Sequence, residues 1–318
     1  MKNRRSFIKD VSLLSASLMM LSSKGLIGAV LDDELKNTLD RKIYIFSKHL
    51  QWLDYSEMAK TAREIGFDGV DLTVRPKGHV LPERVAEDLP KAVKAVRENG
   101  LLADRMTTAI TDPDDELTVQ ILKTAADQGI TNYRLGWLSY DWSIPVNENI
   151  RIFNEKLRKL AALNKQFGLK GAYQNHAGEM AGGPVWDIAL MLEGVDPDYL
   201  GVRYDIRHAT AEGGQSWPIG LNYLADKINS FDLKDFRWEN INGKWSPVTV
   251  PLGEGMVDFA RFFQIIHQQH IAGDITMHFE YELGGAENGT THLTKPAAEV
   301  IAAMKQDISI VRNWLKQN

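Results

Sequence analysis

The stretch NIRIFNEKLRKLAALNKQFGLKGAYQNH, residues 149–176, contains one helix-then-strand unit of a pattern that recurs along the chain. Its first part has the spacing of an amphipathic helix over residues 149–167, with apolar side chains at Ile152, Leu157, Leu160, Leu163 and Phe167. Gly168 is typical of a helix end. Residues 171–176 then predict a strand that finishes in polar side chains.

The same alternation of strand and helix occurs about eight times. The predicted strands are residues 42–46, 69–74, 101–107, 132–137, 171–176, 201–205, 230–235 and 275–282, and a further helix is predicted over 56–65, starting at Ser56. Alternating units of this kind indicate a parallel sheet, and eight without a reversal predict a single (β/α)₈ TIM barrel over residues 31–318. No G-x-G-x-x-G follows the first strand, so we expect no nucleotide cofactor.

The N-terminus has the features of an export signal. Asn3-Arg4-Arg5-Ser6-Phe7-Ile8-Lys9 precedes an uncharged run over residues 11–23, and this resembles a bacterial twin-arginine signal peptide covering residues 1–30. The run is too short to span a bilayer stably. We therefore expect an exported protein, periplasmic or secreted, with no stable membrane insertion after the signal is cleaved.

Composition excludes several classes of site and partner. The chain has no cysteine, which rules out disulfides, thiolate metal sites and cysteine nucleophiles. Its formal net charge is −5, and removal of the basic leader makes it more acidic. An acidic protein repels the negatively charged phosphate backbone of nucleic acids, so a nucleic-acid partner is not expected. Composition leaves a homo-oligomer open.

The last four predicted strands end in ionisable or amide side chains. The catalytic candidates among them are Glu280, His208, Lys234 and His176. Active sites of such barrels lie at the carboxyl ends of the strands, where these side chains would converge. A lone Asp or His that ends a strand is more typically a helix N-cap or a satisfied polar residue, and a Lys-Asp pair there is more typically a salt bridge to a neighbouring loop. Together they would form a buried cluster of charges, which is costly unless the charges are paired, metal-bound or functional.

Tryptophan placement suggests a carbohydrate ligand. Seven of the eight tryptophans fall in or just before the predicted strand–helix connections, and only Trp314 lies in a predicted helix. Indole faces suit the apolar faces of sugar rings. The residues that we expect to bind the substrate are Trp137, Trp186, Trp217, Trp238, Arg207 and His278.

The chemistry that suits these side chains is proton transfer next to a sugar carbonyl. A base removes the proton from carbon, and a cation stabilises the oxyanion that develops. Four residues offer oxygen ligands for a divalent ion: Gln174, Asp205, Asp232 and Glu280. These donors favour Mn²⁺ or Mg²⁺, ahead of Zn²⁺ or Co²⁺, which histidine ligands would favour.

The chain resembles the xylose isomerase-like barrel superfamily over essentially all of residues 31–318. That superfamily includes sugar and sugar-phosphate isomerases and epimerases, inosose dehydratases and endonuclease IV. The stretches that carry the resemblance are Tyr173-Gln174-Asn175-His176, Tyr204-Asp205-Ile206-Arg207-His208-Ala209, Lys234-Asp235-Phe236, Pro251-Leu252-Gly253-Glu254-Gly255 and Phe279-Glu280-Tyr281-Glu282. The resemblance implies that Asp205 and Glu280 are metal ligands and that His208 contacts the substrate.

Two positions depart from what the resemblance implies. Gln174 stands where the epimerases have a glutamate on strand five, and Asp232 stands where they have a histidine on strand seven. Because an amide cannot act as a general base, a two-glutamate epimerase mechanism does not apply as it stands. Either His176 replaces the missing base, or the metal has been lost and Lys234 supplies the positive charge.

Three functions follow from these features. The first is an exported isomerase or epimerase that acts in carbohydrate metabolism on a free or oxidised sugar, with Glu280 as base. The second is a lyase or dehydratase that uses the same base to eliminate a group from a keto-sugar or glycoside. The third is a barrel that binds carbohydrate without catalysis, although it would not be expected to retain Asp205, His208 and Glu280.

Overall fold

The computed structural model describes residues 41–317, and within them eight parallel strands close into a barrel in the order β1-β10-β7-β6-β5-β4-β3-β2. The barrel strands are β1 Ile43–Phe46, β2 Gly69–Val74, β3 Leu102–Thr108, β4 Asn132–Arg134, β5 Lys170–Gln174, β6 Leu200–Asp205, β7 Ile228–Leu233 and β10 Asp274–Met277. The predicted (β/α)₈ barrel is confirmed. The predicted signal peptide, residues 1–30, lies outside the described residues.

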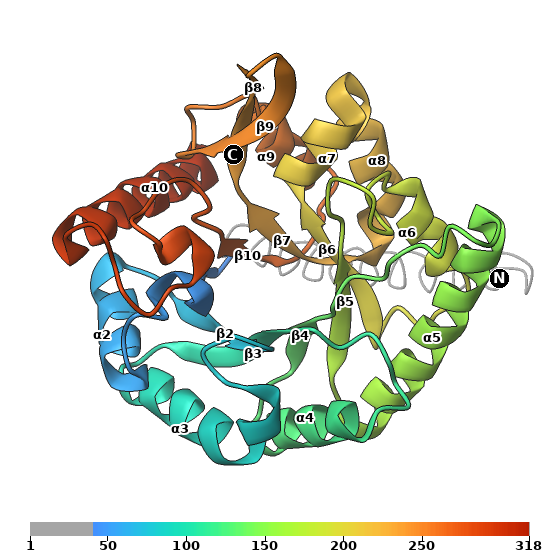
Figure 1. Cartoon of the computed structure of the whole chain (residues 1–318), viewed down its shortest axis with the longest axis horizontal. Helices are drawn as coiled ribbons and strands as arrows, with labels where there is room; N and C mark the ends of the chain where they lie inside the picture. Colours follow the sequence, from blue (N-terminus) through green and yellow to red (C-terminus); the bar gives the residue numbers. More distant parts are fainter. Residues whose placement is uncertain (1–40, 318) are drawn as a thin grey trace, which may run out of the picture. The chain divides into compact units, whose positions relative to one another are not determined.

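The helices form a ring around the strands (Figure 1). They are α2 Tyr55–Ile65, α3 Val85–Glu98, α4 Glu116–Asp127, α5 Val146–Phe167, α6 Trp186–Met191, α7 Ile206–Gly213, α8 Trp217–Leu224, α9 Phe259–Gln268 and α10 Ala297–Gln317. Short 3₁₀ turns are η1 Ser47–Leu50, η2 Pro82–Arg84, η3 Gly214–Ser216, η4 Ala225–Lys227 and η5 Ala286–Asn288. The helix predicted to start at Ser56, with that serine as its N-cap, starts at Tyr55 instead. Its cap is the Asp54 side chain, which accepts from Glu57 N at 2.9 Å.

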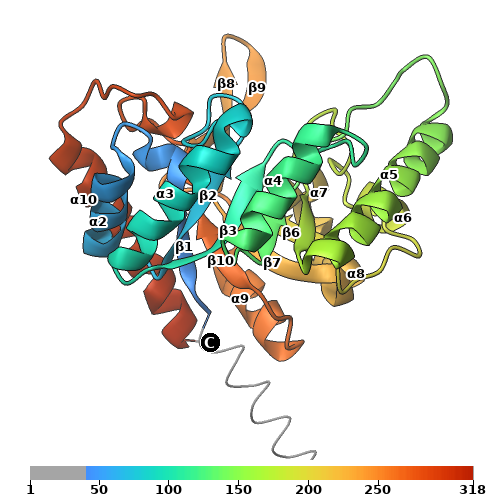
Figure 2. The same ribbon diagram turned by 90° about the horizontal axis from the view of Figure 1, so that it is seen from below.

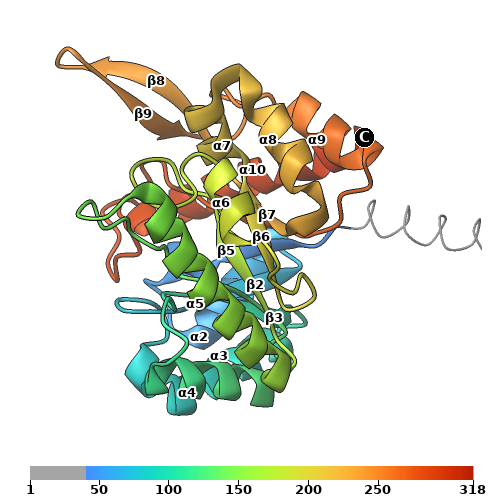
Figure 3. The same cartoon turned by 90° about the vertical axis from the view of Figure 1, so that its right-hand side faces the viewer.

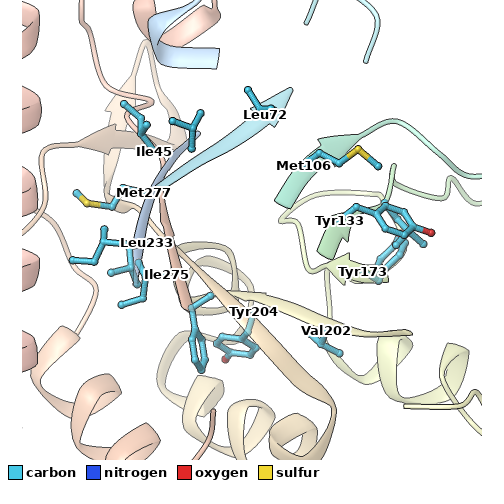
Figure 4. Packing of buried hydrophobic residues seen from close by; sticks show 14 of the residues in the cluster. Ile45, Leu72, Met106, Tyr133, Tyr173, Val202, Tyr204, Leu233, Ile275 and Met277 are labelled. Atoms are coloured by element: carbon cyan, nitrogen blue, oxygen red, sulfur yellow. The ribbon is translucent and has the colours of Figure 1, made fainter. Parts of the chain in front are cut away.

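Alternation along the strands separates an apolar outer layer from a polar interior. The outward side chains pack under the helices, and Figure 4 shows part of this layer, including Ile45, Leu72, Tyr204 and Met277. The residues between them point inward because successive side chains on a strand face opposite sides. Contacts from one side of the barrel to the other, described below, are made by these inward residues. The fold therefore places the charged strand residues Asp71, Arg203, Asp205 and Asp232 inside the barrel.

Strand eight is shorter than predicted. β10 ends at Met277, so His278 and Glu280 lie in the loop that follows rather than on a strand. Glu282, predicted to share their face, is instead exposed and pairs with Lys295. Because the chain leaves the barrel early, it can turn across the mouth, which is the end of the barrel where the strands finish. Glu280 therefore reaches side chains of neighbouring strands.

A hairpin that the sequence analysis did not anticipate follows β7. β8 Asp235–Ile241 and β9 Lys244–Val250 pair antiparallel, and the hairpin extends beyond the ring at the end where the barrel strands finish (Figure 2 and Figure 3). Its turn is Asn242-Gly243, with φ of 54° and 84°. Positive φ at both positions is what a tight hairpin turn requires, and Asn-Gly adopts it at little cost.

Asp235, the first residue of the hairpin, anchors the returning chain. Its carboxylate accepts hydrogen bonds from the backbone N–H groups of Phe236, Gly253, Gly255 and Val257, at 2.8–3.1 Å.

Among residues 41–317, no helix is long and apolar enough to cross a membrane.

Candidate active site

A buried ion triad lies deepest in the barrel. Arg203 on β6 donates through Nε to Asp232 on β7 at 2.7 Å, and through Nη1 to Asp71 on β2 at 2.6 Å. β2 and β6 are not neighbours in the barrel, so the second bond crosses the interior. Burial alone would raise the pKa of Asp232, but Arg203 and then His278 outweigh burial and hold that pKa below its usual range.

Above the triad, Lys234 is the centre of a second cluster. Its ammonium lies 3.0 Å from Asp205 Oδ2, 3.2 Å from Glu280 Oε2 and 2.8 Å from His208 Nε2. The Lys234 side chain is 2% exposed. Burial alone would lower its pKa, but Asp205 and Glu280 outweigh burial and raise that pKa. Lys234 is therefore a fixed positive charge at neutral pH.

Glu280 is the carboxylate of this cluster that solvent reaches. Its side chain is 30% exposed, whereas those of Asp205 and Asp232 are fully buried. Lys48, just after β1, donates to Glu280 Oε1 at 3.0 Å, so each carboxylate oxygen has its own lysine. Burial alone would raise the pKa of Glu280, but Lys234 and the nearby His278 and Lys48 hold it well below its usual range.

Two histidines beside Lys234 are kept neutral. Asp205 caps α7 by accepting from His208 N at 3.1 Å, which places the His208 ring over the strand ends. The rings of His208 and His176 lie 4.0 Å apart. Burial, reinforced by the charge of Lys234, lowers the pKa of both, that of His208 strongly. At neutral pH both rings are therefore neutral. The two ring nitrogens of His208 face Lys234 and Arg207, at 2.8 and 3.0 Å.

A third histidine, His278, is oriented by the triad. Its Nε2 lies 3.2 Å from Asp232 Oδ1 and 3.3 Å from Arg203 Nη2. Its Nδ1 is buried without a hydrogen-bond partner among the described residues and lies 3.7 Å from Glu280 Oε1. The contacts of Nε2 orient the ring so that Nδ1 lies beside the Glu280 carboxylate, where it could take part in proton transfer.

Gln174 acts as a hydrogen-bond donor at this site. Its amide nitrogen donates to Asp205 Oδ2 at 2.9 Å and to Asp232 Oδ2 at 2.6 Å, while its oxygen accepts from Arg134 at 3.3 Å. Asp205 and Asp232 are direct partners in the β6–β7 register. Two carboxylates placed side by side repel each other, and the amide bridge relieves that repulsion.

These contacts test the predicted metal site, and the donors do not fit a divalent ion. Gln174 presents nitrogen rather than oxygen to the carboxylates. The other three predicted ligands are all paired with protein cations: Asp232 with Arg203, and Asp205 and Glu280 with Lys234. Across residues 41–317, no three His, Asp or Glu side chains are grouped to hold a metal. The donor chemistry is thus that of an ammonium site.

The predicted substrate-binding tryptophans do not all reach the mouth. Trp137 lies there, with its ring 4.6 Å from that of His176. Trp238 stands on the hairpin, 40% exposed. The structure places Trp186 on the outer surface against Tyr223, because it starts α6 rather than ending a strand. Trp217 is buried against Phe262 in the helix layer.

The remaining predicted residues converge. The structure brings together His176, Arg207, His208, Lys234, His278 and Glu280, with Gln174, Asp205 and Asp232 beneath them. Lys48, Asp71 and Arg203 also belong to the site and were not among the predicted residues. A charged residue at an inward position of a predicted strand was the available signal for Asp71 and Arg203. Nothing in the sequence marks Lys48, whose role depends on the loop after β10 crossing the mouth.

Known proteins share this architecture. The family model described as xylose isomerase-like TIM barrel matches residues 59–306. A D-allulose 3-epimerase from Methylomonas sp. in complex with D-allulose has 14% identity and a TM-score of 0.62, covering 86% of this chain and 96% of that chain. A probable 3-DHS dehydratase from Bacillus anthracis has 13% identity and a TM-score of 0.61, covering 85% and 98%.

A xylose isomerase-like TIM barrel protein from Mycobacterium smegmatis, in complex with magnesium, has 12% identity and a TM-score of 0.62, covering 88% of this chain and 98% of that chain. Curated protein sequences give no match. At these identities the solved structures show a common fold, and the family model covers most of the chain. The chain therefore belongs to the xylose isomerase-like TIM barrel family.

Proposed function

We propose that this protein is an enzyme of the sugar isomerase or epimerase kind, which moves a proton next to the carbonyl of a free or oxidised sugar. We also propose that it is exported, because the leader resembles a twin-arginine signal. The observation that carries the proposal is Glu280. It is the exposed member of the carboxylate cluster, it lies between two lysines, and the oriented His278 is beside it.

Glu280 can act as a base despite its low pKa because that pKa depends on hydrogen bonds that change when substrate binds. Lys48 and Lys234 both hydrogen-bond its carboxylate and so weaken it as a proton acceptor. A sugar carbonyl that accepts the hydrogen bond from Lys234 takes one partner away from Glu280. Its pKa then rises towards the ordinary value as substrate binds.

The proposed step breaks a C–H bond next to the carbonyl. The proton goes to a Glu280 oxygen, and the electron pair forms an enediolate whose negative oxygen faces Lys234. A fixed ammonium in a buried site stabilises such a charge without reorganising. The proton returns to the neighbouring carbon in an isomerisation, either from Glu280 or through His278 Nδ1, which lies 3.7 Å away.

Lys234 takes the role that a divalent ion would otherwise have. We propose that the reaction needs no metal, because Asp205, Asp232 and Glu280 are already paired with protein cations and Gln174 presents its amide nitrogen. The magnesium complex of the Mycobacterium smegmatis protein is a property of that protein.

Elimination from a keto-sugar is the second candidate. It is favoured by the single exposed carboxylate, since epimerisation with one base on each face of the substrate needs two. Elimination needs one base and an acid for the leaving oxygen, and Lys234 or a histidine protonated during the reaction would supply that proton.

The proposal is tested by turnover of a panel of free and keto-sugars, with products identified by NMR. Glu280→Gln should lower turnover by roughly 10²- to 10⁴-fold, because the amide cannot accept the proton. Glu282→Gln is the matched control, since Glu282 is exposed and pairs outside the site. Unchanged turnover in Glu280→Gln would remove Glu280 as base. An unsaturated product would select elimination.

A further inference from the structure

Three arginines at the mouth are held by aromatic rings rather than by carboxylates. The guanidinium carbon of Arg75 lies 5.2 Å from the Phe46 ring centre. That of Arg134 lies 4.3 Å from the Trp137 ring, and that of Arg207 lies 5.1 Å from the Phe236 ring. Stacking of this kind fixes the plane of a guanidinium without neutralising its charge. The side-chain hydrogen-bond partners of these arginines are neutral: Arg134 donates to Gln174 Oε1 and Thr108 O, both at 3.3 Å, and Arg207 Nη1 lies 3.0 Å from His208 Nδ1.

None of the three forms a salt bridge with another residue of the described part of the chain. Arg134 is 3% exposed and Arg207 8%, yet the Nε of each is buried without a partner among these residues. The indole N–H of Trp137, under Arg134, likewise lacks an acceptor. Carboxylates such as Glu280 lie near Arg75 and Arg207 without direct contact. A buried guanidinium that is not directly paired with a carboxylate is costly, so arginines kept this way are expected to serve a ligand.

At the opposite end of the barrel, one buried arginine contacts carboxylates and another contacts backbone carbonyls. Arg105 lies on the same barrel and is equally buried, but it contacts the carboxylate of Asp274 at 2.5 Å and that of Asp104 at 3.5 Å. Arg41 at the same end donates to the backbone carbonyls of Gly273 and Ile271, and its guanidinium carbon lies 5.2 Å from the Phe231 ring centre. The mouth differs in gathering three stacked arginines around one site.

The charges of the mouth do not balance. Asp71 and Asp232 share Arg203, while Asp205 and Glu280 share Lys234 and Lys48. The first group has one excess negative charge and the second has none.

Arg75, Arg134 and Arg207 add three positive charges to this cluster, which leaves the mouth positive although the whole chain is acidic. Burial first, and then the nearby Arg203 and Arg75, lower the pKa of Arg134 to about 9. These cations therefore destabilise one another until an anion binds.

From this arrangement we infer that the substrate is an anionic sugar, with a carboxylate or phosphate group bound by Arg75 and Arg134 beside the reacting carbon. The reaction of this sugar rests on the proposed function, whereas the predicted binding of the anion depends only on the arginines. Guanidinium groups bind both anions through paired hydrogen bonds. A sugar acid is the form that a neutral sugar takes after oxidation, so an oxidation must precede this enzyme if the group is a carboxylate.

The test is calorimetric binding at matched ionic strength. The probes are D-glucuronate, D-galacturonate and D-gluconate, each beside its uncharged parent sugar, and D-glucose 6-phosphate. At least one acid or the phosphate should bind roughly tenfold more tightly than its parent. Arg75→Gln should abolish that preference. Its guanidinium makes no hydrogen bond to the described residues, so the charge is removed without breaking the network. Arg261→Gln, on the exposed side of α9, should keep the preference.

Each outcome decides the inference. Tighter binding of the acids identifies a carboxylate, and tighter binding of the phosphate identifies a phosphate ester. Neutral sugars that bind as tightly as the anions, anions that do not bind, or a preference that survives Arg75→Gln would each overturn it. Solvent-deuterium exchange into the bound sugar separates the two proposals. An acid that binds without exchange defeats the proposed reaction alone, and a neutral sugar that exchanges without anion preference defeats this inference alone.

Discussion

At the scale of single residues, Gln174 sets the character of the site. A glutamate there would place a third carboxylate beside Asp205 and Asp232, and such a group requires a cation. The amide instead donates to both carboxylates, and Lys234 supplies the charge above them. The glutamine that stands at position 174 in place of a glutamate is therefore consistent with the Lys234 ammonium that lies next to Asp205.

Gln174→Glu should destabilise the protein because it removes two hydrogen-bond donors and adds a buried negative charge. We expect a loss of about 3 kcal/mol in the free energy of unfolding at about pH 8. The loss should shrink as the pH falls, because the new carboxyl can then take up a proton. Denaturant unfolding at several pH values measures this. A variant as stable as the parent at high pH would show that Gln174 does not bridge the two aspartates.

Lys48→Gln tests how the lysines control Glu280. Lys48 donates to Glu280 in the ligand-free enzyme and helps to hold its pKa well below the ordinary value. Without that charge the pKa of Glu280 should rise. The acid limb of the pH profile of kcat/KM, which reports the free enzyme, should move to higher pH. Lys295→Gln, which alters only the exposed pair with Glu282, is the control. An acid limb that stays in place would argue against Glu280 as the titrating base.

At the scale of elements, two connections shape the mouth. β10 ends at Met277, which lets the following loop carry Glu280 to Lys234. β7 continues directly into the β8–β9 hairpin, and Asp235 ties the returning chain back to the barrel. The sequence predicted the strands but not these connections. Asn242-Gly243 was a readable turn signal, whereas the early end of β10 depends on which neighbours its last residues meet.

Gly255→Ala should damage the hairpin anchor. An added Cβ at Gly255 would lie 2.1 Å from Asp235 Oδ1 and 2.4 Å from Phe236 O, so the loop must move. We expect a loss of about 2 to 4 kcal/mol in unfolding free energy. Gly213→Ala is the matched control, since its Cβ would meet nothing closer than 3.5 Å. Equal thermal stability of the two variants would contradict the packing of this loop.

At the scale of the whole molecule, the barrel itself was predictable from the sequence because strand and helix alternate about eight times. Which side chains pair inside the barrel was not. Arg203 and Asp71 are 132 positions apart, and only closure of the barrel brings them together. Trp186 and Trp217 show the converse, because proximity to a strand end in the sequence did not place them at the mouth.

Buried neutral histidines should make the protein sensitive to mild acid. His49 accepts from Phe279 N at 3.0 Å and donates to Ala286 O at 3.1 Å, so protonation would break the first bond. Burial, with Lys48 and His278 nearby, lowers the pKa of His49 well below the ordinary 6.5.

A lowered pKa contributes stability that is complete above the unfolded value and is lost as the pH falls below it. Unfolding free energy should therefore fall from about pH 7 to 5, by up to about 1.4 kcal/mol per pH unit for each of His49 and His208. His49→Gln should flatten this slope and His292→Gln, at an exposed position, should not. An unchanged slope in His49→Gln would contradict the buried neutral ring.

The most direct test of the central claim is incorporation of solvent deuterium at sugar carbon, followed by NMR in D₂O after the protein has been treated with a chelator. The account predicts that a substrate sugar gains deuterium next to its carbonyl, at the same rate with and without the chelator, because Glu280 moves the proton and Lys234 provides the charge. No incorporation with any sugar of the panel would contradict the proton transfer. Exchange that stops with the chelator and returns with Mn²⁺ would contradict the role given to Lys234.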